Sequence, residues 1–177
     1  MPYDINCSGC PYNNQDHLNG TQHYNPVLFP VVLEDNGSAV LLILQAPGIE
    51  EWRNGRPVVP TVTQGGTGGA RIAASWKRTR VERIGFDIVN AVQCFPGKDS
   101  KGDRKPSALA ICACSKRLRE IVLSKSYTKI IALGDVAYQA AYCVVNALPM
   151  EPELIRGPHP NSRIKGVSTN DALDALW

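Results

Sequence analysis

The sequence predicts an α/β fold: a three-layer α/β/α sandwich around a mainly parallel central sheet. Short continuous apolar runs, typical of strands buried on both faces, alternate along the chain with longer segments of helical periodicity. The chain has 177 residues, of which 44% are apolar, and this suits one domain with a sizeable core. We therefore expect residues 1–177 to form a single domain, with an N-terminal cluster-binding segment and helices on both faces of the sheet.

The first expected elements are an edge strand and a buried strand. The segment 27–33 follows Pro26 and contains Pro30, and prolines suit an edge strand better than a central one. The segment 40–44 is an uninterrupted apolar run that Pro47 and Gly48 bring to an end. The sequence thus places the first parallel strand immediately before a turn.

Three helices and two further buried strands are expected after it. The strands are predicted over 88–92 and 130–133, and the helices over 70–83, 106–123 and 135–148. Asp135 is the expected N-cap of the last helix. Binding sites of parallel sheets form beyond the carboxyl ends of the strands. The predicted site therefore lies at Gln45–Gly48, Asn90–Cys94 and Leu133–Gly134.

Four of the six cysteines form the most informative pattern of the chain. Cys7 and Cys10 make a C-x-x-C pair, Cys94 follows a predicted strand, and Cys114 lies in a predicted helix. Thiolates are soft ligands that suit iron–sulfur clusters or zinc. The alternative is that Cys114 is a small core residue and the pair a simple turn.

The helical periodicity distinguishes Cys114 from its neighbour Cys112. Cys114 shares a face with Leu118 and other apolar residues, whereas Cys112 points roughly 200° away from it. Cys114 is therefore the better expected ligand. Cys112 and Cys143 are expected to be free thiols.

The expected environment of the chain agrees with metal binding. The N-terminus has no basic region followed by an apolar run, and no apolar stretch approaches the roughly 20 residues that span a bilayer. We expect a cytoplasmic monomer without a membrane partner. In a reducing compartment, six cysteines favour a metal or cluster over disulfides.

The basic residues gather in three segments, although the net charge of +3 is small. The segments are 71–83, 98–105 and 156–165. Such groups are typical of a surface that meets a polyanion, and a solvated charged surface is the alternative.

Six short motifs occur in an informative order. They are the C-x-x-C pair, the loop Leu44–Gly48, the segment Gly55–Val58, the strand Asp87–Asn90 with Cys94 after it, the dipeptide Leu133-Gly134 and the loop His159–Asn161. In this order, and with Cys114 on a helix, the chain resembles the family 4 branch of the uracil-DNA glycosylase superfamily. The resemblance runs from Cys7 to about Arg163.

The resemblance implies a cofactor and an activity. It implies a 4Fe-4S cluster on Cys7, Cys10, Cys94 and Cys114, with zinc as the alternative metal. It also implies a DNA glycosylase of base excision repair, which hydrolyses the N-glycosidic bond of a deaminated base, foremost uracil, after that base has flipped out of the DNA.

The resemblance also implies roles for individual residues. Asn90 would read the base edge, because one amide matches both the O4 acceptor and the N3–H donor of uracil; capping of a strand–loop junction is the alternative. His159 would stabilise the negative charge that develops on the base, as a neutral imidazole donor. The other implied substrate-binding residues are Ala46, Pro47, Gly48, Val58 and Asn161. Separately, the basic segment 156–165 makes Arg163 and Lys165 the expected DNA-binding residues.

Two departures from the family pattern bear on activity. Gln45, at a catalytic position, stands where the family has glutamate, and Val58 replaces a phenylalanine that offers a stacking face. Trp52 or Phe95 are candidates to replace that face. These departures favour the alternative of a catalytically weak or inactive iron–sulfur protein that binds nucleic acid, or of a member with altered base specificity.

Overall fold

The computed structural model of the protein contains a five-stranded sheet with the strand order β1-β3-β2-β6-β7. The structure describes residues 7, 9–12, 33–60, 66–100, 102–148, 152–162 and 165–177. The strands are β1 (Leu33–Glu34), β2 (Val40–Leu44), β3 (Asp87–Asn90), β6 (Lys129–Leu133) and β7 (Glu153–Gly157). The last four strands run parallel to one another, and β1 pairs antiparallel with β3 at the edge of the sheet.

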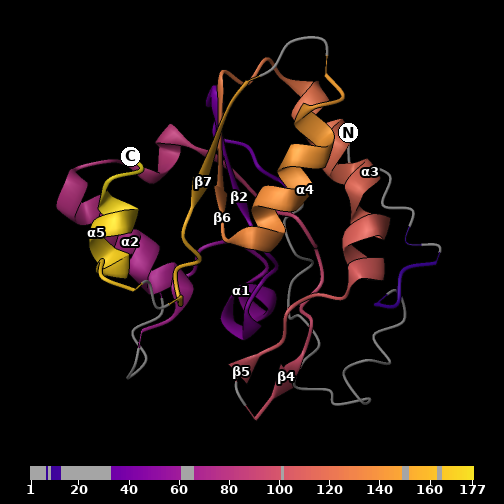
Figure 1. Ribbon diagram of the computed structural model, residues 1–177, viewed down its shortest axis with the longest axis horizontal. Helices are drawn as coiled ribbons and strands as arrows, with labels where there is room; N and C mark the ends of the chain where they lie inside the picture. Colours follow the sequence, from indigo (N-terminus) through magenta and orange to yellow (C-terminus); the bar gives the residue numbers. More distant parts are fainter. Residues whose placement is uncertain are drawn as a thin grey trace.

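Helices cover both faces of this sheet (Figure 1). Alternate residues of β2 show why its sequence is continuously apolar. Leu41 and Ile43 pack with Leu118 of α3 (Ala108–Ser124) and with α4 (Asp135–Val145), while Leu42 packs with Ile72 of α2 (Gly68–Thr79) on the other face. Helix α5 (Thr169–Asp174) lies beside α2 and adds Leu173 to the second core. The predicted α/β class with a mainly parallel central sheet is confirmed.

The structure corrects the N-cap predicted for the last of the three expected helices. Asp135 is the first residue of α4, and the N-cap is Gly134, whose φ of 88° lies in the left-handed region. Glycine enters this region without steric cost, and it makes the tight turn from β6 into α4 possible. The other two predicted helices, α2 and α3, begin with side-chain caps, because the hydroxyl oxygens of Thr67 and Ser107 accept hydrogen bonds from the amides of Ala70 and Ala110.

Several elements were not predicted from the sequence. They are β7, α5, the short helix α1 (Ile49–Asn54), a 3-10 turn (Arg83–Gly85) and a hairpin of β4 (Lys98–Asp99) and β5 (Gly102–Asp103). Of the edge strand expected over 27–33, Leu33 begins β1, and 27–32 lies outside the described residues. Within the described part of the chain, we found no helix with the length and apolar character needed to cross a membrane.

Candidate functional site

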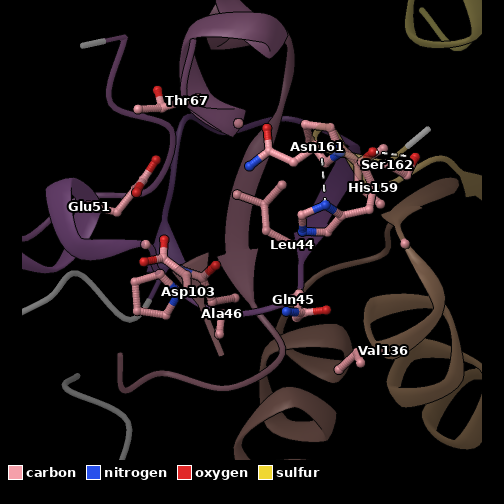
Figure 2. A pocket seen from close by; sticks show the side chains of 18 of the residues that line it. Leu44, Gln45, Ala46, Glu51, Thr67, Asp103, Val136, His159, Asn161 and Ser162 are labelled. Carbon is pink, nitrogen blue, oxygen red and sulfur yellow. Dashed lines mark hydrogen bonds between the residues drawn. The ribbon is translucent and has the colours of Figure 1, made fainter. Parts of the chain in front are cut away.

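The carboxyl ends of the four parallel strands border a pocket of about 1500 Å³. Its walls also include α1, the first turn of α2, the β4–β5 hairpin and the loop after β7. Figure 2 shows side chains from these elements converging on the pocket. The pocket is lined by most residues of the predicted site: Gln45, Ala46, Pro47, Gly48, Val58, Asn90, His159, Asn161 and Lys165. Arg163 lies outside the described residues.

Asn90 ends β3 and is 4% exposed. Its Oδ1 atom is buried and has no hydrogen-bond partner among the described residues. The backbone beside it is held in place, because the Ala91 amide donates to the Leu44 carbonyl at 2.8 Å. A buried acceptor without a partner costs free energy until a donor meets it. Asn90 is therefore ready to accept a hydrogen bond from a ligand in the pocket.

His159 presents its imidazole to the same pocket (Figure 2). Its Nδ1 accepts a hydrogen bond from the Asn161 backbone amide at 3.2 Å. An acceptor at Nδ1 places the proton of the neutral ring on Nε2. Burial, and then the positive charge of Lys105, lower the pKa of His159. The ring is thus a neutral N–H donor at neutral pH.

The loop that carries His159 is fixed on two sides. The His159 carbonyl accepts hydrogen bonds from the amide and the hydroxyl of Ser162, both at 2.8 Å. A Cβ at Gly134 would lie 3.0 Å from the His159 Cβ. Glycine at this position therefore lets the imidazole approach the N-terminus of α4. The positive end of the helix dipole there favours a neutral ring, and it also favours an anionic ligand in the pocket.

Two carboxylates of the site were missed by the sequence reasoning. Glu51, on α1, and Asp103, at the end of the hairpin, line the pocket on the side away from His159 (Figure 2). A Cβ at Gly48 would lie 2.7 Å from the Glu51 Oε2 atom and 3.0 Å from the Asp103 Oδ2 atom, so a side chain at this position would displace the two carboxylates. No local pattern of the sequence marked Glu51 or Asp103 as site residues, because their positions depend on the path of α1 and of the hairpin.

The carboxyl of Glu51 is held in an unusual environment. Burial is the main cause that raises its pKa, and the negative charge of Asp103 raises it further. The backbone amides of Val59 and Gly48 donate hydrogen bonds to it, which partly offsets the effect of burial. A carboxyl with a raised pKa in a pocket is a candidate for proton transfer.

Replacing Glu51 with glutamine is expected to stabilise the folded chain at neutral and higher pH. Because the folded pKa of Glu51 is raised, its protonated form contributes stability below the ordinary glutamate pKa, and this contribution is lost as the pH rises through the raised value. Melting temperatures of wild type and Glu51→Gln, measured from about pH 4 to about pH 8, should diverge as the pH rises, with the variant higher.

The control is Glu50→Gln, which removes a carboxylate from the same turn of α1. Glu50 pairs with Arg53 at 3.5 Å at the surface, and an exposed pair of this kind contributes little. Parallel curves for wild type and Glu51→Gln over the whole pH range would contradict the raised pKa.

The structure changes the interpretation of the expected stacking residues. Val58 borders the pocket but is 1% exposed, with a φ of 53° that is uncommon for a β-branched residue. Arg83 holds it there by donating to the Val58 carbonyl at 2.7 Å. Trp52 and Phe95 are 3% and 0% exposed and pack together in a separate core. The expectation that either replaces the stacking face is wrong, because their rings are already covered.

The predicted cysteine ligands come together beside the pocket. Cys7, Cys10, Cys94 and Cys114 belong to one packed group, in which Ala46 of the pocket loop also takes part. Cys114 is buried, whereas Cys112 and Cys143 are exposed. The choice between Cys114 and Cys112 by helical periodicity thus agrees with their burial.

Two hydrogen bonds shape the N-terminal cysteine pair and fasten its segment to α3. The Cys10 amide donates to the Cys7 carbonyl at 2.9 Å, which closes a turn. The Ser107 amide donates to the Tyr12 hydroxyl at 2.9 Å, which fastens the segment to the start of α3. The C-x-x-C turn is therefore positioned by α3, the helix that carries Cys114.

The chemistry of this group fits a soft metal centre with four thiolates. Burial first, and then the three neighbouring thiols, raise the pKa of the Cys94 thiol to about 12. Thiols of this kind ionise when a metal is bound. Arg117 lies beside them, 4% exposed, and forms a side-chain hydrogen bond with Cys114, while its Nε and Nη1 atoms meet no oxygen acceptor among the described residues. An anionic centre would compensate that buried positive charge.

In the described residues, no group of three or more His, Cys, Asp or Glu side chains is arranged to hold one metal ion. Zinc needs four ligands at about 2.0–2.3 Å around a single centre. Cys7, Cys10, Cys94 and Cys114 supply soft ligands of the kind that would suit either a 4Fe-4S cluster or zinc.

The comparisons with known proteins agree with this architecture. The family model described as the uracil DNA glycosylase superfamily matches residues 31–177. A comparison with curated proteins found no match. The matched segment includes the five strands and the whole pocket, and it begins after Cys7 and Cys10.

Proposed function

Because this chain belongs to the uracil DNA glycosylase superfamily, we propose that it hydrolyses the N-glycosidic bond of a deaminated base, foremost uracil, in DNA. The observation that carries the proposal is the pairing of two groups in one pocket. Asn90 offers a buried acceptor without a partner, and His159 offers a neutral N–H donor. Together they match a base edge that must be read and a leaving group that must be stabilised.

The proposed reaction begins with the base flipped into the pocket. Asn90 Oδ1 accepts the N3–H of uracil, and its amide nitrogen donates to O4. As the bond between C1′ and N1 breaks, its electron pair moves onto the base, and negative charge develops at O2. His159 Nε2–H donates to O2 and keeps its proton, because a hydrogen bond is enough to stabilise this charge.

Water then attacks C1′ of the sugar cation from the side of the acidic residues. Glu51 orients this water and accepts its proton, and the released base anion takes a proton from solvent. The Gln45 side chain also lines the pocket and can orient water, but a neutral amide cannot accept its proton. This arrangement assigns to Glu51 the carboxylate function that Gln45 lacks.

The family 4 assignment and the 4Fe-4S cluster are part of the proposal. Cys7, Cys10, Cys94 and Cys114 would hold the cluster, which would supply structural cross-linking rather than chemistry at the base. They would tie the N-terminal segment to the end of β3 and to α3, and Ala46 lies against the same group. The cluster would therefore stabilise the loops after β2 and β3, which border the pocket.

DNA is the proposed partner, and the mouth of the pocket carries cations that suit phosphate. Lys98, Arg104 and Lys105, from the hairpin and the residues after it, line the pocket, and so does Lys165 from the segment after β7. The first turn of α2 also lines the pocket, and the positive end of its helix dipole there favours an anion. Phosphates on both sides of a flipped nucleotide would meet these groups.

Replacing Arg163 and Lys165 with alanine is expected to weaken DNA binding and to flatten its salt dependence. Each lost phosphate contact should reduce the slope of log K against log salt by about 0.9 on duplex DNA. Fluorescence anisotropy over a series of salt concentrations measures both effects. The control is Lys116→Ala with Arg119→Ala, which removes two exposed cations of α3 outside the pocket. Equal slopes for the two double variants would contradict the assignment.

Base release from synthetic oligonucleotides tests the proposed activity. Uracil-containing and hypoxanthine-containing strands, single and duplex, are incubated with excess protein, and abasic sites are cleaved with alkali. Release of either base supports the proposal. No release from any deaminated substrate by protein that binds DNA would instead support a nucleic-acid-binding role, in agreement with Gln45 and the buried Val58.

A further inference from the structure

Arg117 is a positive charge inside the protein without a carboxylate partner. It lies on α3, three residues after Cys114, and is 4% exposed. Among the residues that the structure describes, no carboxylate forms an ion pair with it. Burying a guanidinium is costly unless a counter-charge and hydrogen bonds compensate it. The missing counter-charge calls for an explanation.

The hydrogen bonds of Arg117 point toward the end of β3. Its Nη2 atom donates to the Asn90 carbonyl at 2.6 Å and to the Ala91 carbonyl at 3.2 Å. These carbonyls belong to the last residue of β3 and to the residue after it, before the loop that leads to Cys94. Arg117 therefore fixes the backbone from which the Asn90 amide projects into the pocket.

The other edge of the guanidinium faces the cysteines. Nε and Nη1 are buried and meet no oxygen acceptor among the described residues. The thiols of Cys114, Cys94 and Cys7 act electrostatically on this group, and the Cys114 thiol also accepts a side-chain hydrogen bond from it. The guanidinium thus contacts both the end of β3 and the four-thiol group.

We infer that Arg117 is a positioning residue that links the four-cysteine centre to the base-reading Asn90. Four thiolates make an iron–sulfur or zinc centre anionic, and Arg117 supplies the buried counter-charge and N–H donors to sulfur. The same rigid group holds the Asn90 and Ala91 carbonyls. This inference rests on the proposed function, and it adds that metal occupancy and the geometry of the pocket are coupled through one side chain.

The planar fork of arginine is essential to this role. Lysine would place one charge near the thiolates, but it cannot hold two carbonyls and the sulfur side at the same time. The other cations of this part of α3, Lys116 and Arg119, are exposed. They are therefore unsuited to the role, and they provide a matched control.

The test compares Arg117→Met, Arg117→Lys and the control Arg119→Met in anaerobically reconstituted protein. The first readout is the rate at which a chelator removes iron, followed by the visible absorption. The second is hydrogen exchange of the amides 90–92. The third is the single-turnover rate of base release, with substrate affinity measured separately.

Arg117→Met is expected to lose iron roughly 10- to 100-fold faster than wild type, the range found when an outer-shell partner is removed. Its amides 90–92 should exchange faster. Arg117→Lys should recover most of the iron retention but not the slow exchange or the base-release rate. Arg119→Met should match wild type in all three readouts.

Iron loss and exchange at wild-type rates in Arg117→Met would overturn the inference. If that variant does not fold, wild type with and without chelator decides, because removing the metal should speed exchange at 90–92, and unchanged exchange would overturn the coupling. A wild type that binds neither iron nor zinc also overturns it. Base release by metal-free wild type would then leave the glycosylase proposal intact.

Discussion

Replacing His159 with alanine is expected to lower the single-turnover rate of base release by about 10²- to 10³-fold, the effect of losing one preorganised donor to a developing anion. The donor is preorganised because the Asn161 amide occupies Nδ1 and the ring lies against Gly134. Rapid-quench assays on uracil-containing oligonucleotides with excess protein measure this step. The affinity for the same DNA should change little, since the interaction forms mainly in the transition state.

The pH dependence provides a separate check on His159. Burial and Lys105 lower its pKa, so the neutral ring should persist below the ordinary histidine value. The rate should therefore stay level as the pH falls through that value, and decline only at the lowered pKa. The stability contributed by the neutral ring should instead be lost between the ordinary histidine pKa and the lowered one, because in that range the unfolded chain takes up a proton that the folded ring does not. A rate that falls in step with the ordinary histidine pKa would contradict the neutral-donor assignment.

Asn90→Ala is the companion experiment on the base-reading edge. It removes the buried acceptor, so uracil should lose its advantage over bases without a matching N–H and carbonyl edge. Asn90→Asp is the matched variant, because it keeps the shape but presents acceptors where the amide donates. A wild-type preference for uracil in both variants would show that another group reads the base.

Replacing Cys114 with alanine is expected to abolish the visible absorption of the purified protein and its iron content. Cys112→Ala, two residues earlier on the same helix but exposed, should keep both. Removing one ligand would also leave the thiols of Cys7, Cys10 and Cys94 and the buried Arg117 without a metal centre to compensate their charges. The melting temperature of Cys114→Ala should therefore fall below that of Cys112→Ala.

Iron and sulfide analysis after anaerobic purification measures this outcome. About four irons and four sulfides per chain are expected in wild type and in Cys112→Ala. Stoichiometric zinc without iron, in protein produced with ample iron, would replace the cluster assignment. Loss of iron in Cys112→Ala but not in Cys114→Ala would overturn the choice of ligand.

The central strands of the sheet could be predicted from the sequence because they are buried on both faces. β2 and β6 have continuous apolar sequences because helices pack on each side of them. β7 was missed because Glu153 and Arg156 interrupt its apolar pattern, as is possible at the edge of a sheet. α5 is a six-residue helix, too short for its periodicity to stand out.

The candidate site could be predicted where a motif carries its own chemistry. Asn90, His159 and the cysteines stood in an ordered pattern, and the fold brings them to one end of the sheet. The positions of Glu51 and Asp103 depend on the path of α1 and the hairpin, which no local pattern specifies. The burial of Trp52 and Phe95 likewise depends on packing between distant segments.

The β4–β5 hairpin bears on how substrate range could diversify in relatives of this protein. Its base is closed by a hydrogen bond of 2.9 Å from the Arg104 amide to the Gly97 carbonyl. The chain therefore leaves and rejoins the scaffold at nearly the same place, between the third and fourth cysteines. Hairpins of other lengths and charges can be exchanged there while the sheet and thiols stay in register. Substitutions or length changes in this hairpin would therefore alter the wall of the pocket without changing the hydrophobic core on the two faces of the sheet.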